Sequence, residues 1–184
     1  MRLVVGLGNP GKEYRGTRHN IGSEVVERLA EKAGINLRRK WRLHARVGRG
    51  TVRGMILTLA TPRTFMNLSG GPVAALLRWE RCPPGELLVV SDDIALALGE
   101  IRIKQGGSSG GHKGLESIIR ALGTEDFPRL RIGVGRPTDD WVGHVLGRFS
   151  REEAEAAEGA RARAEEAVQE IITSGLDAAM NRFN

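Results

Sequence analysis

The stretch that decides the fold is Leu3–Gly11, LVVGLGNPG, where an apolar run meets the spacing Gly-x-Gly-x-x-Gly. A short continuous apolar run bounded by glycines is typical of a strand buried inside a sheet. The glycine spacing also matches the loop of dinucleotide-binding proteins, in which a helix begins inside the motif. The stretch therefore predicts an inner strand and raises the question of which kind of site follows it.

The residues that follow do not suit a dinucleotide site. Asn9-Pro10-Gly11 is a turn sequence, and the first helical pattern begins only near Ser23. A dinucleotide fold also needs an acidic residue about 20 positions beyond the motif, at the end of the second strand, whereas Glu31 falls within the predicted helix. A dinucleotide-dependent oxidoreductase therefore stays a minor alternative. Asn9 either forms the turn or holds a side-chain amide at the rim of the sheet.

Strands and helices alternate along the rest of the chain. Apolar runs and alternating patterns predict strands at residues 3–7, 55–60, 87–90, 100–104 and 130–134, with a further mixed, basic stretch at 36–50. Helical spacing predicts helices at residues 23–33, from Pro72 onward, at 115–122 and, after the capping box Ser150–Glu153, to about residue 173. This alternation predicts an α/β domain over residues 1–184, with a sheet covered on both faces and its chemistry at the strand ends.

Charge and cysteine content narrow the class of protein. The net charge is +6, and residues 1–63 hold 14 Lys and Arg against 4 Asp and Glu. A basic half favours a polyanionic partner such as a nucleic acid, the alternative being a solvated basic surface. Cys82 is the only cysteine, which excludes an intrachain disulfide and a cysteine-based metal site. With no apolar run of roughly 18 residues and no signal-peptide pattern, we expect no membrane association and a cytoplasmic protein.

Polar side chains that could do chemistry follow the predicted strands. Asn9, Asn67 and Asp92 each come at or after a strand end, His112 closes the glycine-rich loop 104–114, and His19 lies just before a helix. A histidine and a carboxylate together activate water as a general base, and amides hold the substrate or a developing oxyanion. Because no Cys or Ser sits in the sharp strand-to-helix turn of a nucleophile elbow, the sequence favours direct attack by water over a covalent intermediate.

Two alternatives use the same residues. His19, His112 and Asp92 form a possible His₂Asp zinc site, ranked lower because two amides beside a base–acid pair suit ester or amide hydrolysis. The glycine-rich loop is an anion-binding candidate where it enters a helix, although Lys113 is followed by Gly114 rather than by the Ser or Thr of a Walker motif. A mobile surface loop is the simpler interpretation of that segment.

Taken in order, these stretches resemble bacterial peptidyl-tRNA hydrolases over nearly the whole chain. The matching segments are GLGNPGKEY at 6–14, TRHNIG at 17–22, TFMNLSG at 64–70, a strand ending in Asp, GGHKGL at 110–115, RLRIGVGRP at 129–137 and MNRF at 180–183. The resemblance implies a single three-layer α/β domain with a mixed, mostly parallel twisted sheet. It implies hydrolysis of the ester between a peptide and the 3′ end of tRNA, which frees tRNA from abandoned synthesis, without metal or cofactor.

The resemblance also assigns roles to residues. It implies His19 and Asp92 as the catalytic pair, and it implies substrate or tRNA binding by Asn9, Tyr14, Asn67, Lys104, His112 and Arg131. The partner would be the acceptor stem and 3′ end of peptidyl-tRNA, and we expect a monomer. The helix after Ser150 would be the mobile flank over the cleft.

The chain departs from the family pattern at three places. Lys113 stands where the family usually has Asn and would add a phosphate contact, Ala95 replaces an Asp, and Ser108-Ser109 replaces a Gly-His pair. Lys113 is the main feature in favour of a rival hypothesis, an RNA-binding protein on the same fold that has lost catalysis. The retained His19 and Asp92 argue against that rival, so the sequence favours the enzyme.

Overall fold

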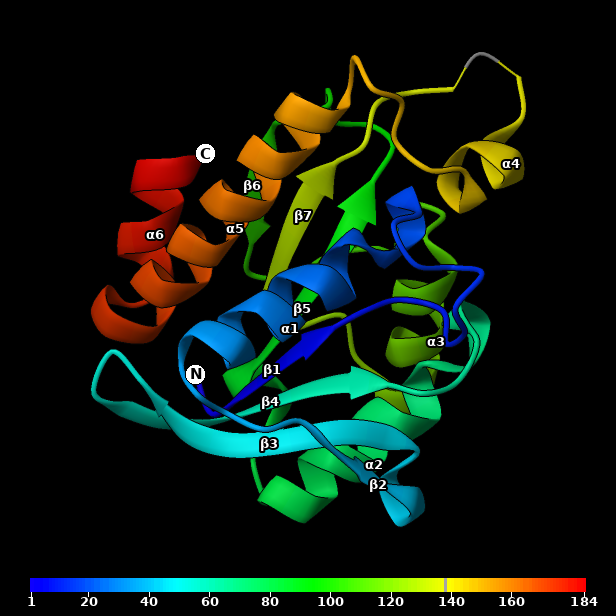
Figure 1. The fold of residues 1–184 in the computed structure, drawn as a ribbon. Coiled ribbons are helices and arrows are strands. Elements are labelled where there is room, and N and C mark those ends of the chain that lie inside the picture. Colours follow the sequence, from blue (N-terminus) through cyan, green and yellow to red (C-terminus); the bar gives the residue numbers. More distant parts are fainter. Residues whose placement is uncertain (138) are drawn as a thin grey trace.

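The computed structural model describes residues 1–137 and 139–184, and within them seven strands form one sheet (Figure 1). The strand order is β2-β3-β4-β1-β5-β7-β6. The strands are β1 Leu3–Gly6, β2 Arg38–Lys40, β3 Ala45–Val52, β4 Met55–Pro62, β5 Leu87–Asp93, β6 Ile101–Lys104 and β7 Arg129–Gly133.

The centre of this sheet is parallel and its flanks are antiparallel. β1 pairs in parallel with β4 and with β5, and β5 pairs in parallel with β7. The outer pairs β2–β3, β3–β4 and β6–β7 are antiparallel. The carboxyl ends of β4, β1, β5 and β7 therefore meet along one edge, where parallel sheets place their sites. The prediction of a mixed, mostly parallel sheet is confirmed.

The described residues form six α-helices, five of which cover the two faces of the sheet (Figure 1). One face carries α1, α5 and α6, and the other carries α2 and α3, which gives the predicted three layers. The helices are α1 Ile21–Lys32, α2 Gly70–Glu80, α3 Lys113–Leu122, α4 Trp141–Leu146, α5 Ala154–Ser174 and α6 Leu176–Phe183. Among these described helices none combines the length and apolar character needed to cross a membrane.

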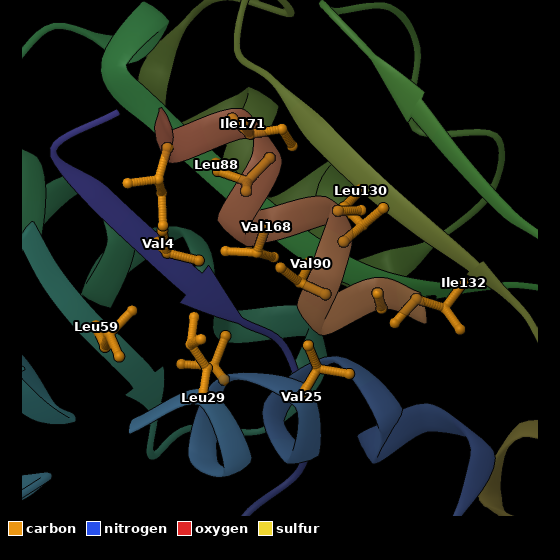
Figure 2. Packing of buried hydrophobic residues seen from close by; sticks show 14 of the residues in the cluster. Val4, Val25, Leu29, Leu59, Leu88, Val90, Leu130, Ile132, Val168 and Ile171 are labelled. Atoms are coloured by element: carbon orange, nitrogen blue, oxygen red, sulfur yellow. The ribbon is translucent and has the colours of Figure 1, made fainter. Parts of the chain in front are cut away.

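Alternate residues of the strands supply the two cores. On the α1 and α5 face, strand residues such as Val4 and Leu88 meet Val25 and Leu29 of α1 and Val168 of α5 (Figure 2). All of these side chains are almost fully buried. Burial of aliphatic side chains stabilises the fold by about 1.5–3 kcal/mol each, so the sparse aromatic content costs the core little.

The opening glycines allow close packing rather than nucleotide binding. A Cβ built on Gly6 would lie 2.3 Å from the carbonyl oxygen of Gly22, and one built on Gly22 would lie 2.3 Å from that of Val90. Only glycine at both positions lets the first turn of α1 rest on β1 and β5. The short 3₁₀ helix Arg18–Asn20, which precedes α1, is thereby placed over the carboxyl edge of the sheet.

The structure differs from the sequence-based prediction in three elements. The helices α4 and α6 were not predicted, since α4 spans only six residues with a glycine inside and α6 is separated from α5 by Gly175 alone. β5 extends beyond its apolar run to include Asp92 and Asp93. The capping box is present, with reciprocal bonds between Ser150 and Glu153, and α5 begins directly after it.

Candidate active site

A histidine and an aspartate meet at the carboxyl edge of the sheet. His19 comes from the 3₁₀ helix before α1, and Asp92 is the penultimate residue of β5. The Nδ1 of His19 lies 2.8 Å from Oδ1 of Asp92, and the side chains are 12% and 2% exposed. His19 and Asp92 are 73 residues apart in sequence. Close packing of α1 on β5 brings these two predicted residues together in space.

A second histidine binds the same carboxylate oxygen. The Nε2 of His112 lies 3.0 Å from Oδ1 of Asp92. Its Nδ1 accepts hydrogen bonds from the backbone N–H groups of Gly114 and Leu115 at 3.1 and 3.2 Å, which caps α3. Because Nδ1 is an acceptor, the neutral ring carries its proton on Nε2 and donates it to Asp92. Both ring nitrogens of His112 therefore already have hydrogen-bond partners, and neither is free to bind a further group.

The carboxylate between the two rings is ionised. Burial alone would raise the pKa of Asp92, but the imidazoles of His112 and His19 that face it hold the pKa well below its ordinary value of 3.8. The charged oxygen accepts the Nδ1–H of His19 and so fixes the tautomer of that ring. The Nε2 of His19 then carries a lone pair and has no hydrogen-bond partner within residues 1–137 and 139–184. A base with this orientation can take a proton from water.

The same three residues were also a candidate zinc site. One ligand atom from each of His19, Asp92 and His112 lies within 4.8 Å of the others. The donor set does not suit a metal, because Nδ1 of His112 already accepts two backbone N–H groups. A metal on Nε2 would therefore require a ring without any proton. Proton-mediated bonds to Asp92 account for the cluster more simply.

Asn9 is hydrogen-bonded to the residue that precedes Asn67, and neither asparagine is among the residues that line the cavity around His19 and Asp92. The backbone of Asn9 is held by the side chain of Asn20, with bonds of 2.8 and 3.0 Å. Its Oδ1 accepts the backbone N–H of Met66 at 2.8 Å, so its Nδ2 is directed elsewhere as a donor. Asn67, the next residue, is exposed. Tyr14 lies edge-on to Phe65 of the same loop, with ring centroids 6.3 Å apart.

A cavity of about 260 Å³ opens beside the pair. His19, His112 and Lys113 line one part of it, together with Arg131. Apolar side chains form another part of the wall: Ile94, Leu115, Trp141, Val142 and Val145. The last three belong to α4, which the sequence did not predict because the six-residue helix lacks a periodic pattern of useful length.

The expected phosphate-binding residues lie next to this cavity. Lys104 and Arg131 line a smaller hollow of about 80 Å³, which shares Ser109 and Gly110 with the main cavity. The Nε of Arg131 is paired with Asp93, so part of its charge is offset. Lys113 is 70% exposed on the rim and binds Glu116 at 3.1 Å. Because His112 accepts the backbone N–H groups of Gly114 and Leu115, these first-turn amides of α3 are not free to bind an anion.

Comparison with known proteins identifies the family. Residues 3–184 match the family model described as peptidyl-tRNA hydrolase. The chain belongs to the peptidyl-tRNA hydrolase family. Over the full length of both chains it is 49% identical to the peptidyl-tRNA hydrolase of Caldanaerobacter subterraneus subsp. tengcongensis and 48% identical to that of Dehalococcoides mccartyi. The crystal structure of the Acinetobacter baumannii peptidyl-tRNA hydrolase superposes with a TM-score of 0.95 at 39% identity, covering 100% of this chain and 94% of that one.

Membership of the peptidyl-tRNA hydrolase family confirms the resemblance inferred from the sequence motifs. A uridine phosphorylase from Vibrio fischeri shares the fold alone, at 12% identity and a TM-score of 0.55.

Proposed function

We propose that His19 is the general base in the hydrolysis of the peptidyl-tRNA ester, the reaction that this chain performs as a member of its family. The observation that carries the proposal is the pair of bonds at Oδ1 of Asp92. One bond holds His19 with its proton on Nδ1, and the other comes from a ring whose tautomer is fixed by the α3 backbone. The arrangement leaves Nε2 of His19 as the proton acceptor.

The reaction then proceeds in two balanced steps. Nε2 of His19 takes a proton from a water whose oxygen bonds to the ester carbonyl carbon, and the carbonyl becomes an oxyanion. The oxyanion collapses, the bond to the ribose oxygen at the tRNA 3′ end breaks, and that oxygen receives the proton from His19. The products are a free peptide carboxylic acid and a tRNA with its terminal hydroxyl restored. Asp92 stabilises the charge that His19 carries between the steps.

Asn9 and Asn67 read the peptide end of the substrate. The Nδ2 of Asn9 is available as a donor, because its Oδ1 is already bound by Met66. A donor of this kind binds a carbonyl of the first peptide bond or the developing oxyanion. Tyr14 supports the neighbouring loop through Phe65.

Ser109 of the glycine-rich loop supplies no nucleophile. Its hydroxyl oxygen accepts the backbone N–H of Gly111, and no base contacts it among the described residues.

Lys104, Arg131 and Lys113 bind the phosphates of the acceptor end. They surround the two adjoining hollows beside His19, where a backbone leading away from the ester would pass. Edge strand β2 adds three exposed basic residues from the basic half of the sequence. We further infer a monomer that acts in the cytoplasm, on the acceptor stem and 3′ end of tRNA.

The test is release of N-acetyl-amino acid from N-acetyl-aminoacyl-tRNA in the presence of EDTA. Un-acetylated aminoacyl-tRNA serves as the matched control. Rapid cleavage of the blocked ester alone, unchanged by EDTA, supports a metal-independent peptidyl-tRNA hydrolase. Loss of activity on chelation would overturn the water-activation scheme in favour of a metal, and tight tRNA binding without cleavage would favour the RNA-binding rival.

A further inference from the structure

The residue before the base has an unusual set of partners. Arg18 is 9% exposed although it carries a full charge. Its Nη1 donates to the carbonyl oxygens of Arg148 at 2.8 Å and of His144 at 3.4 Å, and its Nη2 binds Glu153 at 2.6 Å. Burying an arginine is costly unless its donors are bonded. Its buried Nε has no hydrogen-bond partner among the described residues, but both terminal nitrogens are bonded, so the side chain binds three groups that are distant in sequence.

Backbone contacts reinforce the same connection. The N–H of Arg18 donates to the carbonyl of Gly147 at 3.0 Å, and Thr17 forms an isolated antiparallel bridge with Arg148. The guanidinium also lies 5.1 Å from the ring centroid of Phe149. The segment that carries His19 is thus fastened to the chain between α4 and α5.

α4 depends on such external anchors. None of its six residues is buried, and Val142 is 67% exposed. Its own anchors are the Asp140 cap at 2.8 Å and the Nε2 of His144, which donates to the carbonyls of Val134 and Gly135 at 3.1 and 3.0 Å. A short helix with little buried surface opens readily unless it is tied down. Yet α4 supplies three apolar side chains to the cavity beside His19.

We propose that Arg18 is a positioning residue that fixes α4 to the segment carrying His19, so that the apolar wall of the cleft and the base keep one relative position. The inference rests on the proposed function and deepens it. Arg18 does not touch the reacting atoms; it acts through the carbonyls at the end of α4 and through Glu153. Loosening the connection displaces the wall, weakens substrate binding and moves substrate relative to Nε2 of His19.

The first experiment compares Arg18→Met with Arg18→Lys on N-acetyl-aminoacyl-tRNA. For Arg18→Met we expect KM to rise and kcat to fall, each on the order of tenfold, because small misplacements at a site are costly. Arg18→Lys keeps the pair with Glu153 but not the forked bonds to both carbonyls, so it should recover part of the loss. Arg28→Met is the matched control, since Arg28 ties α1 to Glu158 and Glu165 of α5 away from the cleft.

The control separates positioning from general stability. Arg28→Met should lower the melting temperature and leave KM and kcat unchanged wherever the variant is folded. The inference would be wrong if Arg18→Met and Arg28→Met changed KM and kcat to the same extent. It would also be wrong if Arg18→Met lowered the melting temperature and left KM and kcat unchanged. Hydrogen exchange gives a second readout: the α4 amides should exchange at least tenfold faster in Arg18→Met, with α3 unchanged.

A double-mutant cycle closes the test. Val142→Ala removes a wall contact and should raise KM in the wild-type background but have little further effect in Arg18→Met, where the wall is already displaced. Additive effects would overturn the inference. Failure of this inference is distinguishable from failure of the proposed function. If the effects of Arg18→Met and Val142→Ala are additive while a separate His19→Ala variant is inactive, only the role of Arg18 is rejected. If His19→Ala is active, His19 is not the base and the proposed function itself is rejected.

Discussion

At the scale of single residues, the site is organised around one oxygen atom. Oδ1 of Asp92 accepts a hydrogen bond from each of two imidazoles, and the two rings play different parts. His112 is locked as a donor because the α3 backbone uses its other nitrogen. His19 is free at Nε2, where the cavity begins. The chemistry therefore depends on a charged carboxylate that accepts on either oxygen, whereas an amide has one accepting oxygen, one donating nitrogen and no charge.

Asp92→Asn tests that dependence. The variant keeps the shape of the side chain but offers an N–H group to rings that present N–H groups themselves, or turns His19 to the wrong tautomer. We expect kcat to fall by about 10³–10⁴-fold, the size of effect seen when the orienting carboxylate of a catalytic histidine becomes an amide. Single-turnover hydrolysis is the measurement, with circular dichroism to show that the fold persists. A fall of less than tenfold would contradict the orienting role.

Asp92 also makes stability depend on pH. Its folded pKa lies below the ordinary value of 3.8, so the charged form is favoured by folding. Its contribution to stability is complete above that ordinary value and is lost as the pH falls through it toward the folded pKa. The difference in unfolding free energy between wild type and Asp92→Asn should therefore be larger at about pH 5 than below about pH 4. A difference that grew on acidification would give the shift the opposite sign.

At the scale of elements, close packing of α1 on β1 and β5 places the base. Gly22 lies where the helix meets the strands, and the space for a side chain is filled by the Val90 carbonyl. The opening glycines match the spacing of a nucleotide-binding motif, but Gly6 among them serves close packing of the helix on the strand. The distinction lies in the spacing between the motif and the first helix, which is too long for a dinucleotide loop.

Gly22→Ala should destabilise the protein by about 1–3 kcal/mol, the typical cost of overpacking, and shift His19 relative to Asp92. Gly159→Ala provides the control, because Gly159 lies within α5 with nothing within 4 Å of an added Cβ, and it should stabilise by about 0.5–1 kcal/mol. Urea denaturation of both variants is the measurement. Equal effects of the two substitutions would contradict the packing argument.

Some elements and contacts could be predicted from the sequence, and others could not. The main strands and the two covered faces could be predicted from apolar periodicity, which is a local signal. The pair His19–Asp92 was implied by the resemblance of the motifs to a known family, while the residues alone left His19 and His112 both as candidates. The bond from His112 to Asp92 could not, since it depends on where the glycine-rich loop folds back in space. The α4 wall and the partners of Arg18 were missed for the same reason, since no local pattern marks carbonyl groups as ligands.

At the scale of the whole molecule, basic side chains of the neighbouring strands β6 and β7 lie beside the cavity that holds His19. The hollow between Lys104 and Arg131 adjoins the cavity beside His19, so a phosphate backbone and the ester can be held together. Basic side chains that bind phosphates release counterions, which makes substrate affinity depend on salt.

Lys104→Ala should raise KM several-fold with kcat nearly unchanged, and should reduce the slope of log KM against log salt by roughly one contact. Arg49→Ala is the matched control, because it removes one exposed charge from β3. In the backbone register of the sheet Arg49 lies opposite Thr58 of β4, which in turn lies opposite Leu3 at the start of β1. Steady-state kinetics at several salt concentrations provide the data. If the control changed the slope as much as Lys104→Ala, overall charge would explain the binding instead.

The most direct test of the central claim is single-turnover hydrolysis of N-acetyl-aminoacyl-tRNA by His19→Ala, with tRNA affinity measured in parallel. If Nε2 of His19 is the base, the rate constant falls by at least 10²–10⁴-fold, the usual contribution of general base catalysis, while the dissociation constant for tRNA stays within twofold. A His19→Ala enzyme that cleaved the ester at nearly the wild-type rate would contradict the account.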